Sequence, residues 1–349
     1  QAGGNHPDMH LGNFLVRPDG GVVTLDLHSV RLSDRPVPAW LRRRRLGKLA
    51  HSFGPHLSPS GVQEVTWFAW AYAGFDHALG PAPALANWLL ERAARVEAIR
   101  LKSRDKRCLV HSTLFTNDRI RGARIYRRRE CSREAVQEAA AATPAATVHV
   151  HPFLRSRLEL IPCPKGLGDS PQVLRKSYAF QGLGKRLGAA FLETAPMRTW
   201  KAARACEVRE IPTANVYALL LDTGVLPAKG VVFMEWIEGA RMLHHLSRAD
   251  PPLPPASRRR LARDLGALMG RFHRLGLKHS DLAGQNVLCR PEADGCDGRR
   301  GWKLWIVDLD DVLVGAMTRA ETLRALVHLG DQPMATRSDR LRFFRAYLN

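Results

Sequence analysis

The alternation of apolar and polar positions divides the chain into a mostly helical first part and a longer second part that begins with strand patterns. Two short apolar runs, at 14–16 and 22–27, surround the turn RPDGG and predict a strand hairpin. Apolar residues then recur every three or four positions, which predicts helices at 40–51 and 62–73. The stretch GPAPALANWLLERAARVEAIRLKSRDKR predicts a third helix, with Pro83 near its start and basic residues at its end.

From about residue 105 the pattern changes to strands. The segment LVHSTLFTNDRIRGARIYRRR predicts a hairpin with NDRIRG as its turn, and Ser132 is suited to cap a short helix. The stretch MRTWKAARACEVRE predicts a further helix. Strands are predicted at 147–152, 157–162 and 172–179 and within IPTANVYALLLDTG and GVVFMEWIEGA. We therefore expect residues 104–238 to form a small lobe built on a sheet.

The last part of the chain is helical in pattern. The segment ASRRRLARDLGALMGRFHRLG places Leu261, Leu265 and Met269 on one face and stops at Gly276, a residue typical of helix ends. Two more helical stretches follow, at 319–329 and 338–348. We expect residues 239–349 to form a second, mostly helical lobe.

Length and composition set the limits of these predictions. The chain has 349 residues, enough for two domains, and holds no apolar run long enough for a transmembrane helix. It begins with Gln, so we expect a fragment that lacks its true N-terminus. The six cysteines are scattered and form no C-x-x-C pair, which argues against zinc and disulfides and suits the cytoplasm.

The charge is strongly basic. Lysine and arginine number 53 against 33 acidic residues, a formal net charge of +20. Each arginine run by itself is an ordinary solvated face, but the total favours binding to anionic partners such as nucleic acid, an anionic membrane or a phosphorylated glycolipid. No nucleic-acid-binding motif accompanies the charge, so no specific nucleic acid is expected.

One polar pattern occurs twice. Near the end, HSDLAGQNVLC is followed by IVDLDDV, and near the start, HPDMHLGNFLV is followed by VVTLDLHSV. Both contain His-x-Asp, an Asn five residues later and an Asp after the next apolar run. The segments WFAWAYAG and RFFRAYLN align as well, so residues 1–74 and 274–349 are interpreted as two copies of one half-domain. The chain is then expected to begin partway through the first of two tandem domains.

The chemistry that fits this pattern is phosphoryl transfer, which needs a positioned nucleophile and neutralised charge. Asp281 would accept the hydroxyl proton, and Asn286 and Asp308 would hold a metal ion. The corresponding residues of the first copy are Asp8, Asn13 and Asp26. The alternative is that these side chains only cap loops, as Asp and Asn often do. For His279 alone, bracing of the loop is the favoured interpretation.

With these motifs the sequence resembles the lipopolysaccharide core kinases, the Kdo/heptose kinase family, from about residue 104 to 349. The resemblance rests on VLRKSYAF, RTWKAARACEVREIPTANVYAL, VVFMEWIEGA, HSDLAGQN, IVDLD and RLRFFRAYL, with a partial second copy at 1–100. It implies an α+β, protein-kinase-like two-lobe fold preceded by a partial kinase-like C-lobe. It further implies ATP, Mg²⁺ and transfer of the γ-phosphate to a sugar hydroxyl of the lipopolysaccharide inner core at the cytoplasmic membrane face.

The resemblance assigns the nucleotide site as well. Lys176 matches the nucleotide lysine of the third N-lobe strand, although Arg175 beside it leaves the register open by one residue. The main-chain groups of Glu235 to Ile237 match the hinge that meets adenine. Asp310 and Asp311 are expected to face solvent or to stand behind the metal ligands.

Two departures from the family pattern matter. The family usually has a glutamate just before the helix tryptophan, able to pair with the lysine, and here Thr199 stands there; Glu193 or Glu207 could substitute. No glycine-rich loop precedes Lys176, so KGLGD is expected to be the turn between the second and third strands, and HPFLRS at 151–156 the phosphate-covering loop.

Three functions stay open at this point. The first is a Kdo/heptose-type sugar kinase, with an anionic glycolipid or sugar acceptor, located in the cytoplasm and held peripherally at the inner membrane. The second keeps the fold but phosphorylates protein or a small molecule. The third is a pseudokinase that binds nucleotide and regulates, which the two departures favour and the intact set Asp281, Asn286 and Asp308 opposes.

Overall fold

The chain divides into two compact units, residues 1–103 and 104–349. The computed structural model describes most of both units. The described ranges are 3–54, 58–120, 122–151, 156–180, 183–224, 228–292, 301–330 and 336–348.

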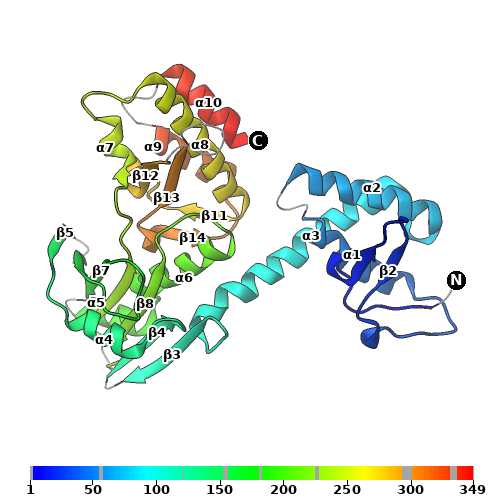
Figure 1. The fold of residues 1–349 in the computed structure, drawn as a ribbon, viewed down its shortest axis with the longest axis horizontal. Helices are drawn as coiled ribbons and strands as arrows, with labels where there is room; N and C mark the ends of the chain where they lie inside the picture. The colour runs from blue at the N-terminus through cyan, green and yellow to red at the C-terminus, as the bar shows by residue number, and fades with distance from the viewer. Residues whose placement is uncertain are drawn as a thin grey trace. The chain divides into compact units, whose positions relative to one another are not determined.

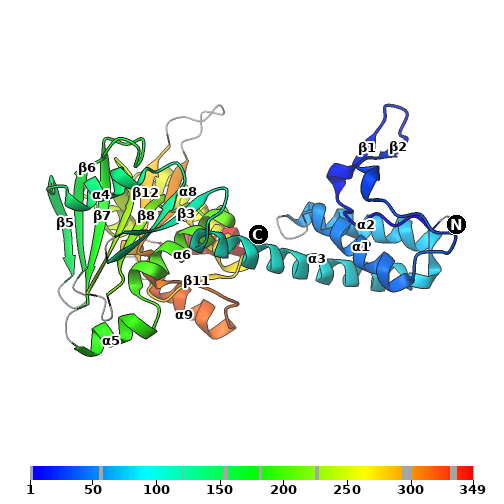
Figure 2. The same ribbon diagram turned by 90° about the horizontal axis from the view of Figure 1, so that it is seen from below.

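The first unit combines one small hairpin with three helices. The predicted elements are confirmed with bounds shifted by a few residues: the hairpin pairs Phe14 with Thr24 and Val16 with Val22. A core of leucine, alanine and valine side chains holds the helices together, and Figure 2 shows the hairpin standing off from them. The elements are η1 (Leu11–Asn13), β1 (Phe14–Val16), β2 (Val22–Thr24), η2 (Leu27–Ser29), α1 (Ala39–Ser52), α2 (Pro59–Phe75), η3 (His77–Leu79) and α3 (Ala82–Asp105).

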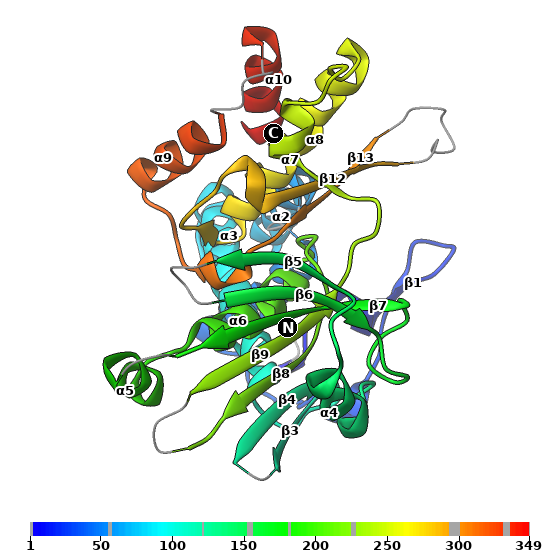
Figure 3. The same cartoon turned by 90° about the vertical axis from the view of Figure 1, so that its left-hand side faces the viewer.

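The second unit begins with a small lobe built on one seven-stranded antiparallel sheet. The strand order is β3-β4-β8-β9-β7-β6-β5, which Figure 3 shows nearly face on. The strands are β3 (Phe115–Ile120), β4 (Ala123–Arg128), β5 (Ala146–His151), β6 (Ser156–Pro162), β7 (Gln172–Ala179), β8 (Val216–Asp222) and β9 (Lys229–Glu235). The helical pieces are η4 (Lys106–Leu109), α4 (Arg133–Ala141), α5 (Leu183–Phe191) and α6 (Ala195–Val208). All seven strands fall within residues 104–238, where a sheet was expected.

Two predictions for this lobe are wrong in detail. The turn of the first hairpin is shorter than NDRIRG, because residues 117–120 already pair with 123–126. The helix α5 was not predicted, because Gly184 and Gly188 interrupt its apolar pattern. Ser132 does cap α4, since its hydroxyl accepts from the amide of Ala135 at 3.0 Å.

The helix α6 is fixed in the core of the small lobe by its tryptophan. The Trp200 ring meets Phe115 edge to face at 5.6 Å, and its indole nitrogen donates to the carbonyl oxygen of Cys108 at 2.9 Å. Such a buried indole needs a hydrogen-bond partner, and this one has it. The residue before it, Thr199, is thereby held toward the sheet.

The second lobe is mostly helical, as predicted, with two small sheets at its base (Figure 1). Gly266 and Gly270 let α8 and α10 touch, because a Cβ at either glycine would lie within 2.4 Å of a backbone oxygen of α10. Its helical elements are α7 (Leu243–Ser247), α8 (Pro255–Arg274), η5 (Gly284–Asn286), η6 (Leu309–Asp311), α9 (Arg319–Gly330) and α10 (Arg337–Leu348). Its strands are β10 (Arg241–Met242), β11 (Leu277–His279), β12 (Val287–Pro291), β13 (Trp302–Ile306) and β14 (Val312–Val314).

The segment IPTA, residues 211–214 of the small lobe, is hydrogen-bonded to the second lobe. The Thr213 hydroxyl donates to the carbonyl oxygen of Ile306 at 2.7 Å, and the amide of Ile306 donates to Pro212 at 3.0 Å. Ile306 ends β13, two residues before Asp308. These bonds therefore set the position of Asp308 relative to the small lobe.

Two further observations bear on the setting of the protein. Within the described residues, no helix is both long and apolar enough to span a membrane. Five of the six cysteines are described, all are free thiols, and burial raises the pKa of Cys108, Cys206 and Cys289 to about 12. These thiols are packing groups, because a thiol with so high a pKa is a poor nucleophile.

Candidate active site

The first part of the site is the loop between β11 and β12, which carries Asp281. The Asn286 amide donates to the main-chain oxygen of Asp281 at 2.7 Å, which closes the loop on itself. The amide of Asp281 donates to Nδ1 of His279 at 3.2 Å, so the ring proton is on Nε2, which faces the oxygen of Val307 at 3.1 Å. His279 is buried and braces the loop, whereas the Asp281 carboxylate is nearly half exposed.

Asp308 lies on the next turn, in an unusual backbone conformation. Its φ of 60° and ψ of 54° are left-handed, which few residues other than glycine, asparagine and aspartate adopt. The amide of Val307 donates to the main-chain oxygen of Asn286 at 3.0 Å, so the turn lies directly beside the loop of Asp281. Asp281, Asn286 and Asp308 are thus brought together by the end of one hairpin.

The small lobe contributes Lys176 from the middle of β7. Its ammonium nitrogen lies 2.7 Å from Oδ1 of Asp308 and 2.6 Å from Oδ1 of Asp310. Arg175 points to the other face of the sheet, where it pairs with Glu159 at 2.9 Å. Lys176, and not Arg175, is therefore the residue of this strand that faces Asp308.

Burial and charge act in opposite directions on this cluster. Burial alone would raise the pKa of Asp308, but the charge and hydrogen bond of Lys176 outweigh it, and the pKa is lowered. Burial, supported by the charge of Asp308, raises the pKa of Asp310 despite Lys176. Burial alone would lower the pKa of Lys176, but Tyr178, Asp310 and Asp308 raise it. The lysine is consequently a fixed positive charge at neutral pH.

Asp310 was expected to face solvent or to stand behind the metal ligands. It does not face solvent, because it is only 8% exposed and contacts Lys176 directly. The expected substitutes for the helix glutamate are engaged elsewhere: Glu193 with Lys201 at 2.6 Å, and Glu207 with Arg128 at 3.0 Å. The run DLDD shows a second aspartate two residues after Asp308, but the sequence does not show in which direction its side chain points.

The hinge follows β9. The amide of Glu235 already donates to the oxygen of Asn215 at 2.8 Å, and the oxygen of Ile237 accepts from Ala240 at 3.3 Å. Some main-chain groups of the expected hinge are thus engaged within the protein, and its contact with adenine stays a prediction. Ile237 is buried beside Ala214 and Trp305, which fixes the hinge on the second lobe.

The loop expected to cover the phosphates joins β5 and β6, the first two strands of the lysine-bearing sheet edge. Residues 152–155, with Arg155, lie outside the described residues. The segment KGLGD is the connection between β6 and β7, as predicted. The order of strands leading to Lys176 therefore agrees with the sequence prediction.

The first unit contains a loop with the same main hydrogen bonds as the loop of Asp281. The Asn13 amide donates to the Asp8 main-chain oxygen at 2.8 Å, and the amide of Asp8 donates to Nδ1 of His6 at 3.2 Å. Nε2 of His6 faces the oxygen of Leu25 at 3.2 Å. Asp26 is again left-handed, with φ 58° and ψ 45°.

The loops of Asp8 and Asp281 differ in what surrounds them. The carboxylate of Asp26 lies 2.7 Å from Nδ1 of His28, whereas that of Asp308 lies against Lys176. Three residues after the loop asparagine, Val16 is 68% exposed where Cys289 is 1% exposed. The hairpin that the second unit buries is thus open in the first unit.

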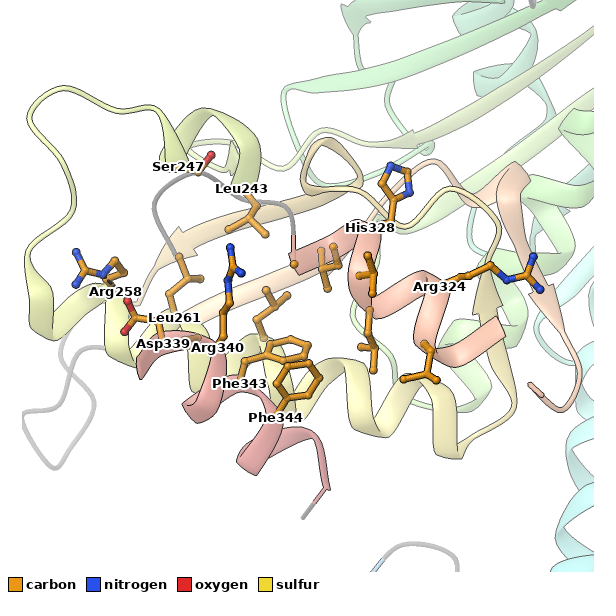
Figure 4. Close-up of a pocket in the computed structure, with 17 residues that line it drawn as sticks. Leu243, Ser247, Arg258, Leu261, Arg324, His328, Asp339, Arg340, Phe343 and Phe344 are labelled. Carbon is orange, nitrogen blue, oxygen red and sulfur yellow. Dashed lines mark hydrogen bonds and ion pairs between the residues drawn. The ribbon is translucent and has the colours of Figure 1, made fainter. Parts of the chain in front are cut away.

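A pocket of about 760 Å³ adjoins the catalytic loop of the second unit, between α8, α9 and α10 (Figure 4). Its walls are mainly leucine and phenylalanine side chains, and three arginines line it as well. His328, at one side of the pocket, lies 3.7 Å from the carboxylate of Asp281. The candidate base is therefore next to an apolar surface.

The donor set at the loop suits Mg²⁺. Asn286 uses its amide nitrogen in hydrogen bonds and keeps its side-chain oxygen, while Asp308 shares only Oδ1 with Lys176. Carboxylate and amide oxygens are hard ligands, and Mg²⁺ in such sites is completed by substrate phosphates and water. Within the described residues, no group of three or more His, Cys, Asp or Glu side chains is placed so that it could hold one metal ion.

A sheet-based lobe with a strand lysine, a hinge, and a helical lobe with the His-x-Asp loop and a following aspartate together define the protein-kinase-like fold. The model of the lipopolysaccharide kinase (Kdo/WaaP) family matches residues 174–347. The second unit of this chain belongs to that family.

Individual relatives cover the same part of the chain. A 3-deoxy-D-manno-octulosonic acid kinase of Stenotrophomonas maltophilia (strain R551-3) is 28% identical over 44% of this chain and 59% of its own length. An EKC/KEOPS complex subunit BUD32 of Chaetomium globosum is 30% identical over 42% and 58%. The chain thus spans about three fifths of these curated relatives. A solved structure, WaaP in complex with acyl carrier protein, aligns with 61% of this chain and 81% of its own at 20% identity and a TM-score of 0.45.

Proposed function

We propose that the second unit is an ATP-dependent phosphotransferase that acts on a sugar hydroxyl of the lipopolysaccharide inner core. The observation that carries this proposal is the pair of Lys176 and Asp308, which come from different lobes and meet at 2.7 Å. Phosphoryl transfer requires a cation for the phosphates and a carboxylate for the metal at one place. Both are present beside the loop of Asp281.

Each residue has one role in this proposal. The main chain of Glu235 and Ile237 holds adenine, and Lys176 holds the phosphates. Asn286 and Asp308 hold Mg²⁺, which neutralises charge on the phosphates when it is bound. Asp281 accepts the proton of the acceptor hydroxyl as the new O–P bond forms and ADP departs. Its exposure suits this role, because the acceptor has to reach it.

The family match and the Kdo kinase relatives support a sugar acceptor. The match to a BUD32 subunit, at 30% identity, supports the second candidate, a kinase of the same fold with another acceptor. The pseudokinase alternative loses support, because the lysine, the base and both metal ligands are assembled although Thr199 replaces the glutamate.

We further propose that residues 1–100 are a kinase-like C-lobe related to residues 239–349, and that it is inactive in this chain. The shared loop hydrogen bonds and the left-handed Asp26 and Asp308 support the relationship. Inactivity is supported by Asp26, whose carboxylate pairs with His28 instead of a strand lysine.

The acceptor is proposed to be an anionic glycolipid at the cytoplasmic face of the inner membrane, where the enzyme would be held peripherally. The net charge of +20 supports this location, because exposed basic residues each contribute about 1 kcal/mol near an anionic leaflet.

The direct test is transfer of the γ-phosphate from Mg-ATP to purified inner-core glycolipid, followed by mass spectrometry of the product. We expect acceptor-dependent ADP release and one added phosphate on a sugar. Robust transfer to protein serines with none to the sugar would establish the second candidate. Nucleotide binding without any transfer would establish the pseudokinase.

A further inference from the structure

The helix position that normally supplies the lysine's carboxylate partner is filled by a residue without charge. In protein kinases a glutamate of this helix pairs with the strand lysine, and both must be in place for activity. Here Thr199 is 1% exposed, and its hydroxyl contacts Tyr178 of the strand that carries Lys176. An ammonium group buried in this way needs a carboxylate, since an unpaired buried charge is strongly destabilising.

Asp310 supplies that carboxylate from the other lobe. Its Oδ1 lies 2.6 Å from the Lys176 nitrogen, slightly closer than the carboxylate of Asp308. Its main chain is held as well, because Arg198 of α6 donates to the Asp310 carbonyl oxygen at 3.0 Å. The helix α6 therefore still contacts the residue that pairs with Lys176, but it does so through the main chain of Asp310.

Thr199 and Tyr178 complete this arrangement. The Tyr178 hydroxyl lies 3.4 Å from Oδ1 of Asp310, to which it can donate, and 3.2 Å from the Thr199 hydroxyl. The Thr199 hydroxyl also lies 3.2 Å from the Ala195 carbonyl oxygen within α6. Each hydroxyl has one proton, so the chain that reaches the carboxylate is Thr199 donating to Tyr178 and Tyr178 donating to Asp310, and the contact of Thr199 with Ala195 is the alternative to its first link.

We propose that Asp310 replaces the helix glutamate as the residue that positions Lys176, and that Thr199 and Tyr178 hold Asp310 in place. The proposal rests on the proposed nucleotide site. The two aspartates then have different roles, because Asp308 can turn to the metal when nucleotide is bound, while Asp310 keeps the lysine aimed at the phosphates. If Asp308 were its only partner, Lys176 would have no carboxylate beside it once Asp308 had turned to the metal.

A double-mutant cycle tests the proposal. The proteins are the wild type, Asp310→Asn, Lys176→Ala and the double variant, all as full chains, measured for Mg-ADP affinity by calorimetry and for kcat/KM toward ATP. Contacting charged pairs show coupling equivalent to factors of about 2 to 150. We expect Asp310→Asn to lower both quantities about 30-fold with Lys176 present and less than about threefold with alanine there.

Asp311→Asn is the matched control. It removes the same charge one residue away, where the carboxylate accepts from the Ser280 hydroxyl at 2.7 Å instead of contacting Lys176. We expect wild-type affinity. If Asp310→Asn fails to fold by thermal unfolding, Tyr178→Phe takes its place in the same cycle, with a smaller loss that again disappears when Lys176 is absent.

Two outcomes overturn the proposal. Equal losses with and without Lys176 would mean that Asp310 does not act through the lysine. A wild type that fails to bind Mg-ADP would overturn it together with the nucleotide site. Failure of the proposed sugar-kinase function can be distinguished from failure of this proposal, because the calorimetric cycle needs no acceptor. Mg-ADP binding that depends on Asp310 through Lys176, without transfer to sugar, would support this proposal and reject that function.

Discussion

The side-chain amide of Asn286 donates to the main-chain oxygen of Asp281 at 2.7 Å. One residue thereby serves two purposes, since the amide nitrogen fixes the loop that carries the proposed base and the amide oxygen is left for a metal. The same bond joins Asn13 and Asp8 at 2.8 Å. The spacing of five residues in the motif is therefore the spacing that lets the asparagine close this loop.

The two units should differ in nucleotide binding. We expect Asp308→Ala to weaken Mg-ATP binding at least about tenfold, because a metal-bridging carboxylate is lost, and Asp26→Ala to leave it unchanged. Calorimetry with Mg-ATP on both variants measures this. Binding that survives Asp308→Ala but is lost with Asp26→Ala would place the nucleotide site in the first unit.

The link between the lobes should contribute to stability and to the site. Thr213→Val removes the 2.7 Å hydrogen bond to Ile306 while keeping the shape of the side chain. We expect a loss of about 1 kcal/mol in the free energy of unfolding, together with weaker Mg-ATP binding, because Asp308 follows two residues later. Denaturant unfolding checks the first effect. Thr223→Val, at an exposed position of the same lobe, is the control and should change little.

The contact of α8 with α10 should be sensitive to pH. Burial lowers the pKa of His273 from an ordinary 6.5 to about 4, and its Nδ1 lies 2.8 Å from the Tyr347 hydroxyl. The unfolded chain then binds a proton that the folded chain does not, so stability falls as pH decreases from 6.5 toward 4. We expect the wild type to lose about 1 kcal/mol more than His273→Gln between about pH 7 and pH 5. Equal losses would show that His273 does not titrate as described.

Membrane association should depend on charge. The attraction of a basic surface to an anionic leaflet decays within about 8 Å at physiological salt. Sedimentation with anionic vesicles should therefore fall steeply from low to high salt, and neutral vesicles should recruit little protein. An RNA control is needed, because the same charge of +20 attracts nucleic acid. Vesicle binding that ignores both salt and lipid charge would contradict the peripheral location.

Much of this architecture could be predicted from the sequence, because the periodic elements and the motif depend on local patterns. The strand around Lys176, the helix around Trp200 and the loop of Asp281 all lie where the apolar pattern placed them. The helix α5 was missed, since its glycines hide its periodicity.

The role of Asp310 could not be predicted in the same way. In the run DLDD three carboxylates lie within four residues, and only the left-handed turn at Asp308 decides where each one points. Asp310 turns to Lys176 from across the lobes, while Asp311 accepts from Ser280. Such a contact between residues 134 positions apart depends on tertiary structure, which the local pattern does not contain.

The most direct test of the central claim is the rate of phosphate transfer by Asp281→Asn compared with that of the wild type, at saturating Mg-ATP and inner-core glycolipid, with nucleotide affinity measured alongside. Loss of a general base should lower kcat by a factor of about 10² to 10⁴ while affinity stays within about threefold, because Asp281 contacts the acceptor and not the nucleotide. A variant that transfers phosphate at the wild-type rate would contradict the assignment of Asp281 and, with it, the active site described for the second unit.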